Sequence, residues 1–169
     1  MKRDISVTVN GRLYQETVEH RLLLNDFLRE TLGLTGTHVG CGYEGRCGVC
    51  TVIYDGIAIK SCLLLAVQAD GASIMTVEGL AQGNELHPLQ KAMRDCHGLQ
   101  CGFCTPGFLM TLYDFLKTSR SNDPAAIRAA MTGVLCRCTG YVHIVEAVAQ
   151  AARELAAMSP AERARWFPQ

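Results

Sequence analysis

The chain has 169 residues, 49% of them hydrophobic, and its 16 basic residues balance 16 acidic ones. That length allows one ordinary domain or two small ones with real cores, and the neutral balance gives no electrostatic reason to bind nucleic acid or an anionic membrane surface. The longest apolar runs, such as SCLLLAV, are far too short to span a membrane.

The first eighty residues have the alternation of strands separated by turns. Residues 5–11, ISVTVNG, end in an Asn-Gly turn signal and residues 12–18 resume the alternation, which predicts a hairpin. Residues 22–33 place apolar side chains at helical spacing and end in Gly33, which predicts a short helix. Further strands are expected in residues 50–56, 57–62 and 72–79. Together these elements predict a small mixed sheet packed on one helix.

The second half has a helical texture, after a polar and glycine-containing linker at residues 77–85. Thr105 is the expected N-cap of one helix with Pro106 at its first position, and Asp123 with Pro124 repeats that signal. The four helices are expected in residues 87–96, 105–119, 122–133 and 142–158. Four helices in so short a stretch predict a compact bundle. The boundaries expected from these patterns are residues 1–80, 81–158 and a C-terminal tail at 159–169.

Eight of the nine cysteines fall into two sets of four. The start of the chain lacks the apolar stretch of a secretory signal, which predicts a cytoplasmic protein, and cytoplasmic thiols stay reduced. Metal or redox chemistry is therefore favoured over disulfides. The first set is Cys41, Cys47, Cys50 and Cys62, and the second set is Cys101, Cys104, Cys136 and Cys138. Four thiolates suit either tetrahedral zinc or an iron–sulfur cluster, and the first set differs by one residue from the plant-type ferredoxin spacing.

The glycines around the first set favour an iron–sulfur cluster over zinc. A cluster is bulky and anionic, and backbone N–H groups that approach its sulfurs stabilise it. Glycines remove the side chains that would block this approach and permit positive φ. The glycines expected to present amides in this loop are Gly42, Gly45 and Gly48, with Gly40 beside them. The second set has its cysteine pairs just before two expected helix starts, where the helix dipole favours anions.

These motifs together resemble one family. The stretches GCGYEGRCGVCTVIYDGIAIKSC, QCGFCTPG and LCRCTGY are similar to those of the iron–sulfur subunit of molybdenum hydroxylases, the family of xanthine dehydrogenase, aldehyde oxidoreductase and aerobic carbon monoxide dehydrogenase. The resemblance extends from about residue 5 to about residue 157. It implies an α+β chain, with a ferredoxin-like β-grasp domain that carries one 2Fe–2S cluster and an all-α four-helix domain that carries another.

The resemblance also implies partners and a function. The chain would be the electron-transfer subunit of a multi-subunit oxidoreductase, without a substrate site of its own, and would pass electrons from a molybdenum–pterin large subunit to an FAD-binding medium subunit. Gln100 matches the family glutamine that hydrogen-bonds the pterin of the large subunit. Whether such heterotrimers dimerise, which substrate is oxidised and what accepts the electrons finally all stay open.

The chain departs from the family at one place, and some features keep a second interpretation. The first two cysteines are separated by five residues where the family has four, and Tyr43 is the apparent insertion.

Cys96 belongs to neither set and is interpreted as a small buried hydrophobe. Arg137 is either solvated or offsets the charge of a cluster. Trp166 and Phe167 lie in a tail that is either frayed or docks on a partner. The rival functions are a zinc-thiolate binding or structural module with two sites and a free ferredoxin that shuttles between partners.

Overall fold

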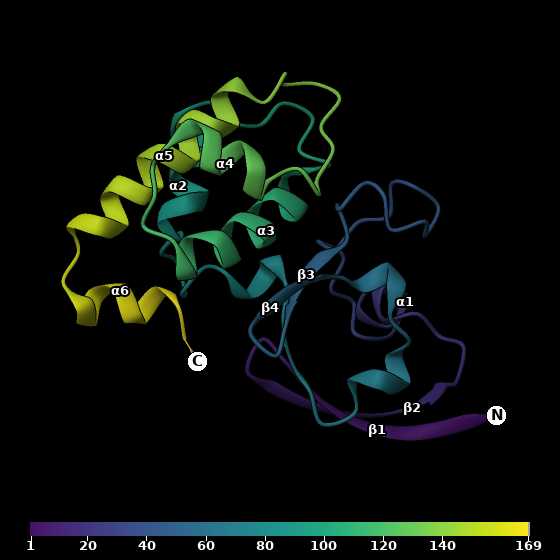
Figure 1. Cartoon of the computed structure of the whole chain (residues 1–169). Coiled ribbons are helices and arrows are strands. Elements are labelled where there is room, and N and C mark those ends of the chain that lie inside the picture. Colours follow the sequence, from purple (N-terminus) through teal and green to yellow (C-terminus); the bar gives the residue numbers. More distant parts are fainter. Residues whose placement is uncertain (169) are drawn as a thin grey trace.

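The structure is a computed structural model that describes residues 1–168. It consists of a half built on a β-sheet and a helical half, which pack against each other (Figure 1). The strands are β1 (Lys2–Val9), β2 (Arg12–Glu19), β3 (Thr51–Tyr54), β4 (Ile57–Lys60) and β5 (Ser73–Met75). The helices are α1 (Leu24–Asp26) with its π-helical continuation η1 (Phe27–Thr31), α2 (Pro88–Asp95), α3 (Thr105–Thr118), α4 (Pro124–Ala130), α5 (Val142–Ala157) and α6 (Pro160–Trp166). Short 3-10 turns are η2 (Ser61–Leu63), η3 (Ala66–Ala69) and η4 (Val77–Gly79).

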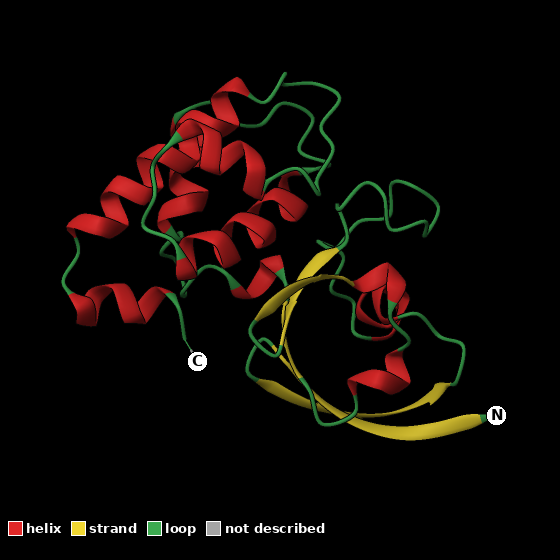
Figure 2. Ribbon diagram, in the orientation of Figure 1, coloured by secondary structure: helices red, strands yellow, loops and turns green. Residues whose placement is uncertain are grey.

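The five strands form one mixed sheet in the order β2-β1-β5-β3-β4. The predicted hairpin is confirmed, because β1 and β2 pair antiparallel along their whole length. β5 joins β1 in parallel and β3 antiparallel, and β4 closes the edge against β3. The three later strands and the helix after the hairpin also lie where the sequence predicts them, so the mixed sheet packed on one helix is confirmed (Figure 2).

The sheet has an apolar layer on each face because side chains alternate along a strand. Val52 of β3 packs with Leu24 and Phe27 under the sheet, in the first of two buried cores. The next residue, Ile53, is part of the second core, which fills the helical half. Helix α3 lies against β3, so this alternation joins the two halves into one packed unit.

The helical half contains the four predicted helices. Asp123 caps α4 as expected, since its carboxylate accepts the N–H of Ala126 at 3.0 Å. The expectation for Thr105 was wrong by one residue: Cys104 is the N-cap of α3 and Thr105 is its first helical residue. The reason is local, because the N–H of Thr105 already donates to the carbonyl of Gly102 and turns the chain one residue early.

Among residues 1–168, no helix combines the length and apolar character that a membrane crossing requires.

The expected tail forms a fifth helix in this half. Ser159 and Glu162 cap each other at the start of α6. Trp166 is 6% exposed and its ring packs edge-on against that of His87, with centroids 5.3 Å apart. Arg163 donates to the carbonyl of Leu116 at 2.6 Å. The interpretation of Trp166 as a partner contact is therefore wrong, because this side chain is buried by its own chain.

Glycines let the two halves approach at backbone distance. A Cβ on Gly107 of α3 would lie 2.4 Å from the carbonyl oxygen of Gly48, and a Cβ on Gly48 would lie 2.2 Å from that of Gly133. Such distances leave no room for a methyl group. Gly48 also has φ +70°, a conformation that side chains disfavour. The first cysteine loop, which contains Gly48, is thus clamped between two segments of the helical half.

The substitution Gly107→Ala tests this close approach. Alanine favours a helix by about 1 kcal/mol over glycine, but overpacking against a fixed backbone costs about 1–3 kcal/mol. We expect Gly107→Ala to lower the melting temperature of the protein by several degrees, as measured by scanning calorimetry. Gly133→Ala is the matched control, because nothing lies within 4 Å of a Cβ at that position. Equal melting temperatures for the two variants would contradict the proposed contact.

Candidate metal centres

The first four cysteines meet at one end of the sheet. Three lie in the loop that leads into β3 and the fourth lies in η2, just after β4: Cys41, Cys47, Cys50 and Cys62. Pairing of β3 with β4 sets Thr51 opposite Lys60, which brings the residues next to this pair close together. The hydroxyl of Ser61 donates to the carbonyl of Cys50 at 2.8 Å and holds η2 against the loop.

The thiols of this set face each other in two pairs. The thiol of Cys47 lowers the pKa of Cys41 and that of Cys62 raises the pKa of Cys50, so the two thiols of each pair interact. Within residues 1–168 no three Cys, His, Asp or Glu side chains converge on a single metal position. One tetrahedral zinc, with Zn–S bonds of about 2.3 Å, would hold all four sulfurs about 3.8 Å from each other. Two pairs of thiols also fit a binuclear cluster, in which four thiolates are shared between two irons.

Backbone amides are directed at the sulfur of Cys41. Hydrogen bonds from the N–H groups lower the pKa of this thiol to about 7, although burial acts in the opposite direction. The donors are the amides of Cys47, Arg46 and Glu44. The sequence reasoning selected the glycine amides, whereas these donors are the neighbours of the glycines. A loop that offers three N–H groups to one sulfur is suited to a thiolate bound to a metal.

The glycines contribute through their conformation. Gly42, Gly45 and Gly48 have φ of +65°, +69° and +70°, which turn the loop back on itself. Tyr43, the apparent insertion, has φ +69°, which is uncommon for a residue with a side chain. Its hydroxyl donates to the carboxylate of Asp26 at 2.9 Å, so the extra residue is anchored to α1.

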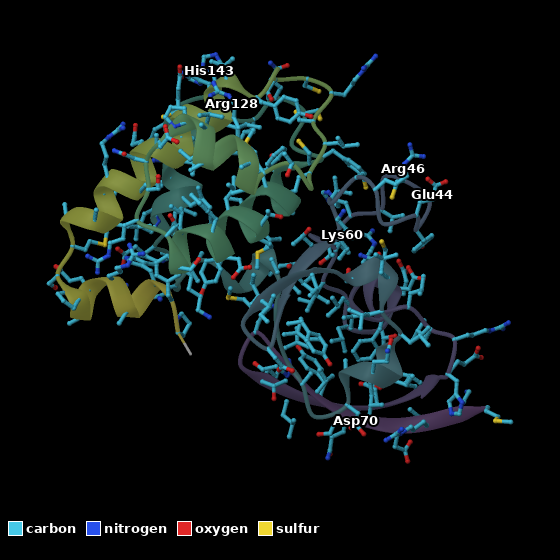
Figure 3. The ribbon with its side chains drawn as sticks, in the orientation of Figure 1. Glu44, Arg46, Lys60, Asp70, Arg128 and His143 are labelled. Carbon is cyan, nitrogen blue, oxygen red and sulfur yellow. The ribbon has the colours of Figure 1, made fainter. Side chains whose placement is uncertain are left out.

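Two cations flank this loop (Figure 3). Lys60 donates from Nζ to the carbonyl of Gly45 at 2.7 Å, and Arg46 pairs with Glu44 at 3.1 Å. Lys60 is the last residue of β4, so the strand itself positions the ammonium group. Lys60 therefore fixes the loop at Gly45, whereas the charge of Arg46 is offset by Glu44.

The second set is assembled from two loops of the helical half. Cys104 is the N-cap of α3, and Cys101 lies in the turn before it. Cys136 and Cys138 lie in the loop between α4 and α5. The thiols again interact in pairs, one from each loop: Cys138 lies 3.6 Å from Cys101, and Cys136 raises the pKa of Cys104. The same binuclear arrangement therefore fits this set as well.

The environments of the paired thiols differ. Burial and the neighbouring Cys136 raise the pKa of Cys104 to about 12. Burial alone would also raise the pKa of Cys136, but hydrogen bonds from the hydroxyl and amide of Thr139 outweigh it and lower the pKa. The phenol of Tyr141 accepts the N–H of Cys136 at 2.9 Å and orders this loop. Cys136 is thus the more easily ionised thiol of the pair, whereas Cys104 would ionise only when a cation binds beside it.

The two sets are neighbours. A cavity of about 440 Å³ is lined by residues of both, including Cys47 from the first set and all four cysteines of the second. The N–H of Leu135, next to Cys136, donates to the carbonyl of Cys47 at 2.9 Å. One hydrogen bond therefore links the residue before a cysteine of the second set to a cysteine of the first set.

The remaining residues singled out in the sequence lie outside the two sets. Gln100 is exposed beside Cys101, and Arg137 is exposed between Cys136 and Cys138. Cys96 is half-buried and its thiol donates to the side chain of Gln150 at 3.2 Å. The sequence reasoning overlooked Lys60 and Thr139. Lys60 reaches Gly45 only through strand pairing, whereas Thr139 lies three residues after Cys136, so its place in LCRCTGY was a local signal that was not used.

The difference between Cys41 and Cys50 can be measured in chain stripped of iron. A thiol with a pKa of about 7 is half ionised at pH 7, whereas burial and the neighbouring Cys62 raise the pKa of Cys50 to about 12. We expect iodoacetamide to alkylate Cys41 well before Cys50 at pH 7, because only the thiolate reacts. The alkylation of Cys41 should be about fiftyfold slower at pH 5 than at pH 7, because its ionised fraction falls from about one half to about one hundredth. Peptide mass spectrometry measures the extent of alkylation at Cys41 and at Cys50. Equal labelling in a chain that retains its far-UV circular dichroism would contradict the geometry.

Two family models cover almost all of the chain. A 2Fe-2S iron-sulfur cluster binding domain matches residues 7–84, and a second 2Fe-2S binding domain matches residues 76–149. The two matched segments contain the first and the second cysteine set respectively. The chain therefore has two 2Fe–2S binding domains.

Relatives are similar over most of their length. Caffeine dehydrogenase subunit gamma of Pseudomonas sp. strain CBB1 is 54% identical over 85% of this chain and 87% of its own. The beta subunit of the 6-hydroxypseudooxynicotine dehydrogenase complex of Paenarthrobacter nicotinovorans is 51% identical over 87% and 92%. The crystal structure of quinoline 2-oxidoreductase from Pseudomonas putida 86 superposes with a TM-score of 0.85, at 49% identity over 90% of this chain and 97% of the matched chain. The chain belongs to the family of iron–sulfur subunits of molybdenum hydroxylases.

Proposed function

We propose that each cysteine set holds one 2Fe–2S cluster. The first four ligands would be Cys41, Cys47, Cys50 and Cys62, and the second four Cys101, Cys104, Cys136 and Cys138. The observation that carries this proposal is the pairing of thiols in both sets, with a facing pair for each iron. When bound, such a cluster accepts and releases one electron at a time.

The residues around each set would hold and tune it. Amides of residues 44, 46 and 47 would donate to the Cys41 sulfur, and Lys60 would place positive charge beside the same loop. At the second set, Thr139 would hold Cys136 ionised. Hydrogen bonds and positive charge near cluster sulfurs raise the reduction potential, because they stabilise the extra negative charge of the reduced state.

The proposed domain boundaries follow the two sets. Residues 1–80 would form a β-grasp ferredoxin-like domain, and residues 81–158 an all-α domain with the second cluster. The contacts of Trp166 and Arg163 support including α6 with the helical domain. The close approach at Gly48 and Gly107 supports a fixed relation between the two domains.

The chain serves as an electron-transfer subunit of a molybdenum-dependent oxidoreductase, and its partners can be assigned to its two ends. A molybdenum–pterin large subunit would lie beside the second set, where Gln100 is exposed and available to hydrogen-bond the pterin. An FAD-binding medium subunit would take electrons from the first set. Apolar side chains exposed around the second set support a covered face there, since Phe103 is 47% and Leu135 55% exposed. We place the complex in the cytoplasm.

The substrate of the complex is proposed from the relatives. Those at 49–54% identity are named for caffeine, 6-hydroxypseudooxynicotine and quinoline, whereas the aldehyde oxidoreductase of Megalodesulfovibrio gigas is 43% identical. We therefore favour a nitrogen-containing heterocycle or a close derivative over an aldehyde. The zinc-module alternative is not supported, because both family models that match the chain are 2Fe–2S domains. A free shuttling ferredoxin is not supported either, because the relatives are subunits of larger enzymes.

Single cysteine variants test the ligand assignment. We expect Cys62→Ala to remove one of two cluster signals in the EPR spectrum of the reduced complex, and Cys104→Ala to remove the other. Each variant should lose about half of the iron, because one cluster of two is missing. Cys96→Ala is the control and should retain both signals. A Cys62→Ala complex with both signals, or a Cys96→Ala complex that lacks one, would contradict the assignment.

A further inference from the structure

His38 joins the two cysteine sets through a side chain. Its ring lies flat on that of Phe103, with centroids 4.6 Å apart and planes 10° from parallel. Its Nδ1 also lies 2.7 Å from the carbonyl oxygen of Phe103. A carbonyl only accepts hydrogen bonds, so Nδ1 carries the hydrogen and donates it. Phe103 stands between Cys101 and Cys104, so this double contact holds the segment that connects two ligand positions.

The other end of this bridge is fixed in the first loop. His38 lies three residues before Cys41, and its own N–H donates to the carbonyl of Val49 at 3.3 Å. The ring of Phe103 also approaches Gly40, where an added Cβ would lie 3.3 Å away. The side chain of His38 therefore connects the first cysteine loop directly to the loop that contains Cys101 and Cys104.

Much of the segment that His38 contacts is exposed to solvent. Leu99, Gln100 and Cys101 are exposed, and Gly102 turns the chain with φ +83°. The opposite loop of the second set has its own connection to the first, the hydrogen bond from Leu135 to the carbonyl of Cys47. The His38 contact is the corresponding connection for the loop that contains Cys101.

We propose that His38 is a positioning residue that fixes the loop from Cys101 to Cys104, and with it the second cluster, at a set distance and orientation from the first. This inference rests on the proposed two-cluster function. In the transfer that it serves, one electron leaves the second site and arrives at the first, with no bond formed or broken and no proton moved. The probability of such a transfer falls steeply with distance, so a loop held in one position keeps the transfer fast.

The test is the magnetic interaction between the two reduced clusters in the assembled complex. This interaction depends on the distance and orientation of the two spins, so it reports geometry and not only folding. His38→Asn keeps a donor near the position of Nδ1 but loses the stacking, and His38→Phe keeps the stacking but loses the donor. His38→Ala loses both. His20→Ala, at an exposed histidine in the sheet half, is the control.

We expect His38→Ala to lose the wild-type spin–spin splitting and to broaden the signal of the second cluster, with the iron content unchanged. The Asn and Phe variants should each retain part of the splitting, and the His20 control all of it. Wild-type splitting and linewidth in His38→Ala at full iron content would overturn the inference. If the His38→Ala complex does not bind its second cluster, the Asn and Phe variants carry the test. Wild-type splitting in both of these variants would then overturn the inference. A wild-type complex without two cluster signals would instead refute the proposed function.

Discussion

Facing pairs of thiols are the constraint on which the rest of this structure depends. Each pair places two groups that become anionic within contact distance, and the partner thiol contributes to the raised pKa values of Cys50, Cys104 and Cys138. A cation between the sulfurs removes this penalty, which is why metal binding and folding are coupled in such sites. In the second set the pairs join two separate loops, so a bound cluster would also fasten the helical half together. Bound clusters would thus stabilise the fold as well as carry electrons.

The packing of the two halves of the chain holds the two cysteine sets in a fixed relation. Alternate residues of β3 face the two cores, and Gly48 and Gly107 let the backbone of the first loop touch α3. The hydrogen bond from Leu135 to Cys47 then crosses between the sets. None of these contacts involves a mobile surface side chain. A rigid connection of this kind is what a chain needs when its task is to hold two redox sites in a constant relation.

Much of this could be predicted from the sequence, and the failures have physical causes. Strand alternation, the Asn-Gly turn and the Asp123-Pro124 cap are local signals, and the structure follows them. The pairing of Cys50 with Cys62 depends on strand register, and the bridge from His38 to Phe103 depends on how two domains pack, which no local pattern reveals. Helix α6 had a signal that was overlooked: SPAE, Ser159 to Glu162, is a capping box. Thr105 was misplaced because a preceding glycine turn started α3 early.

The most direct test of the two-cluster account is the content of iron, acid-labile sulfide and zinc per chain in protein purified from its native host. Two binuclear clusters predict about four iron and about four sulfide, with no zinc. Two iron and two sulfide would contradict the two-cluster account, because only one of the two cysteine sets would then hold a cluster. Zinc without sulfide would contradict the account as a whole, because Zn²⁺ does not change oxidation state and so cannot carry electrons between the partner subunits.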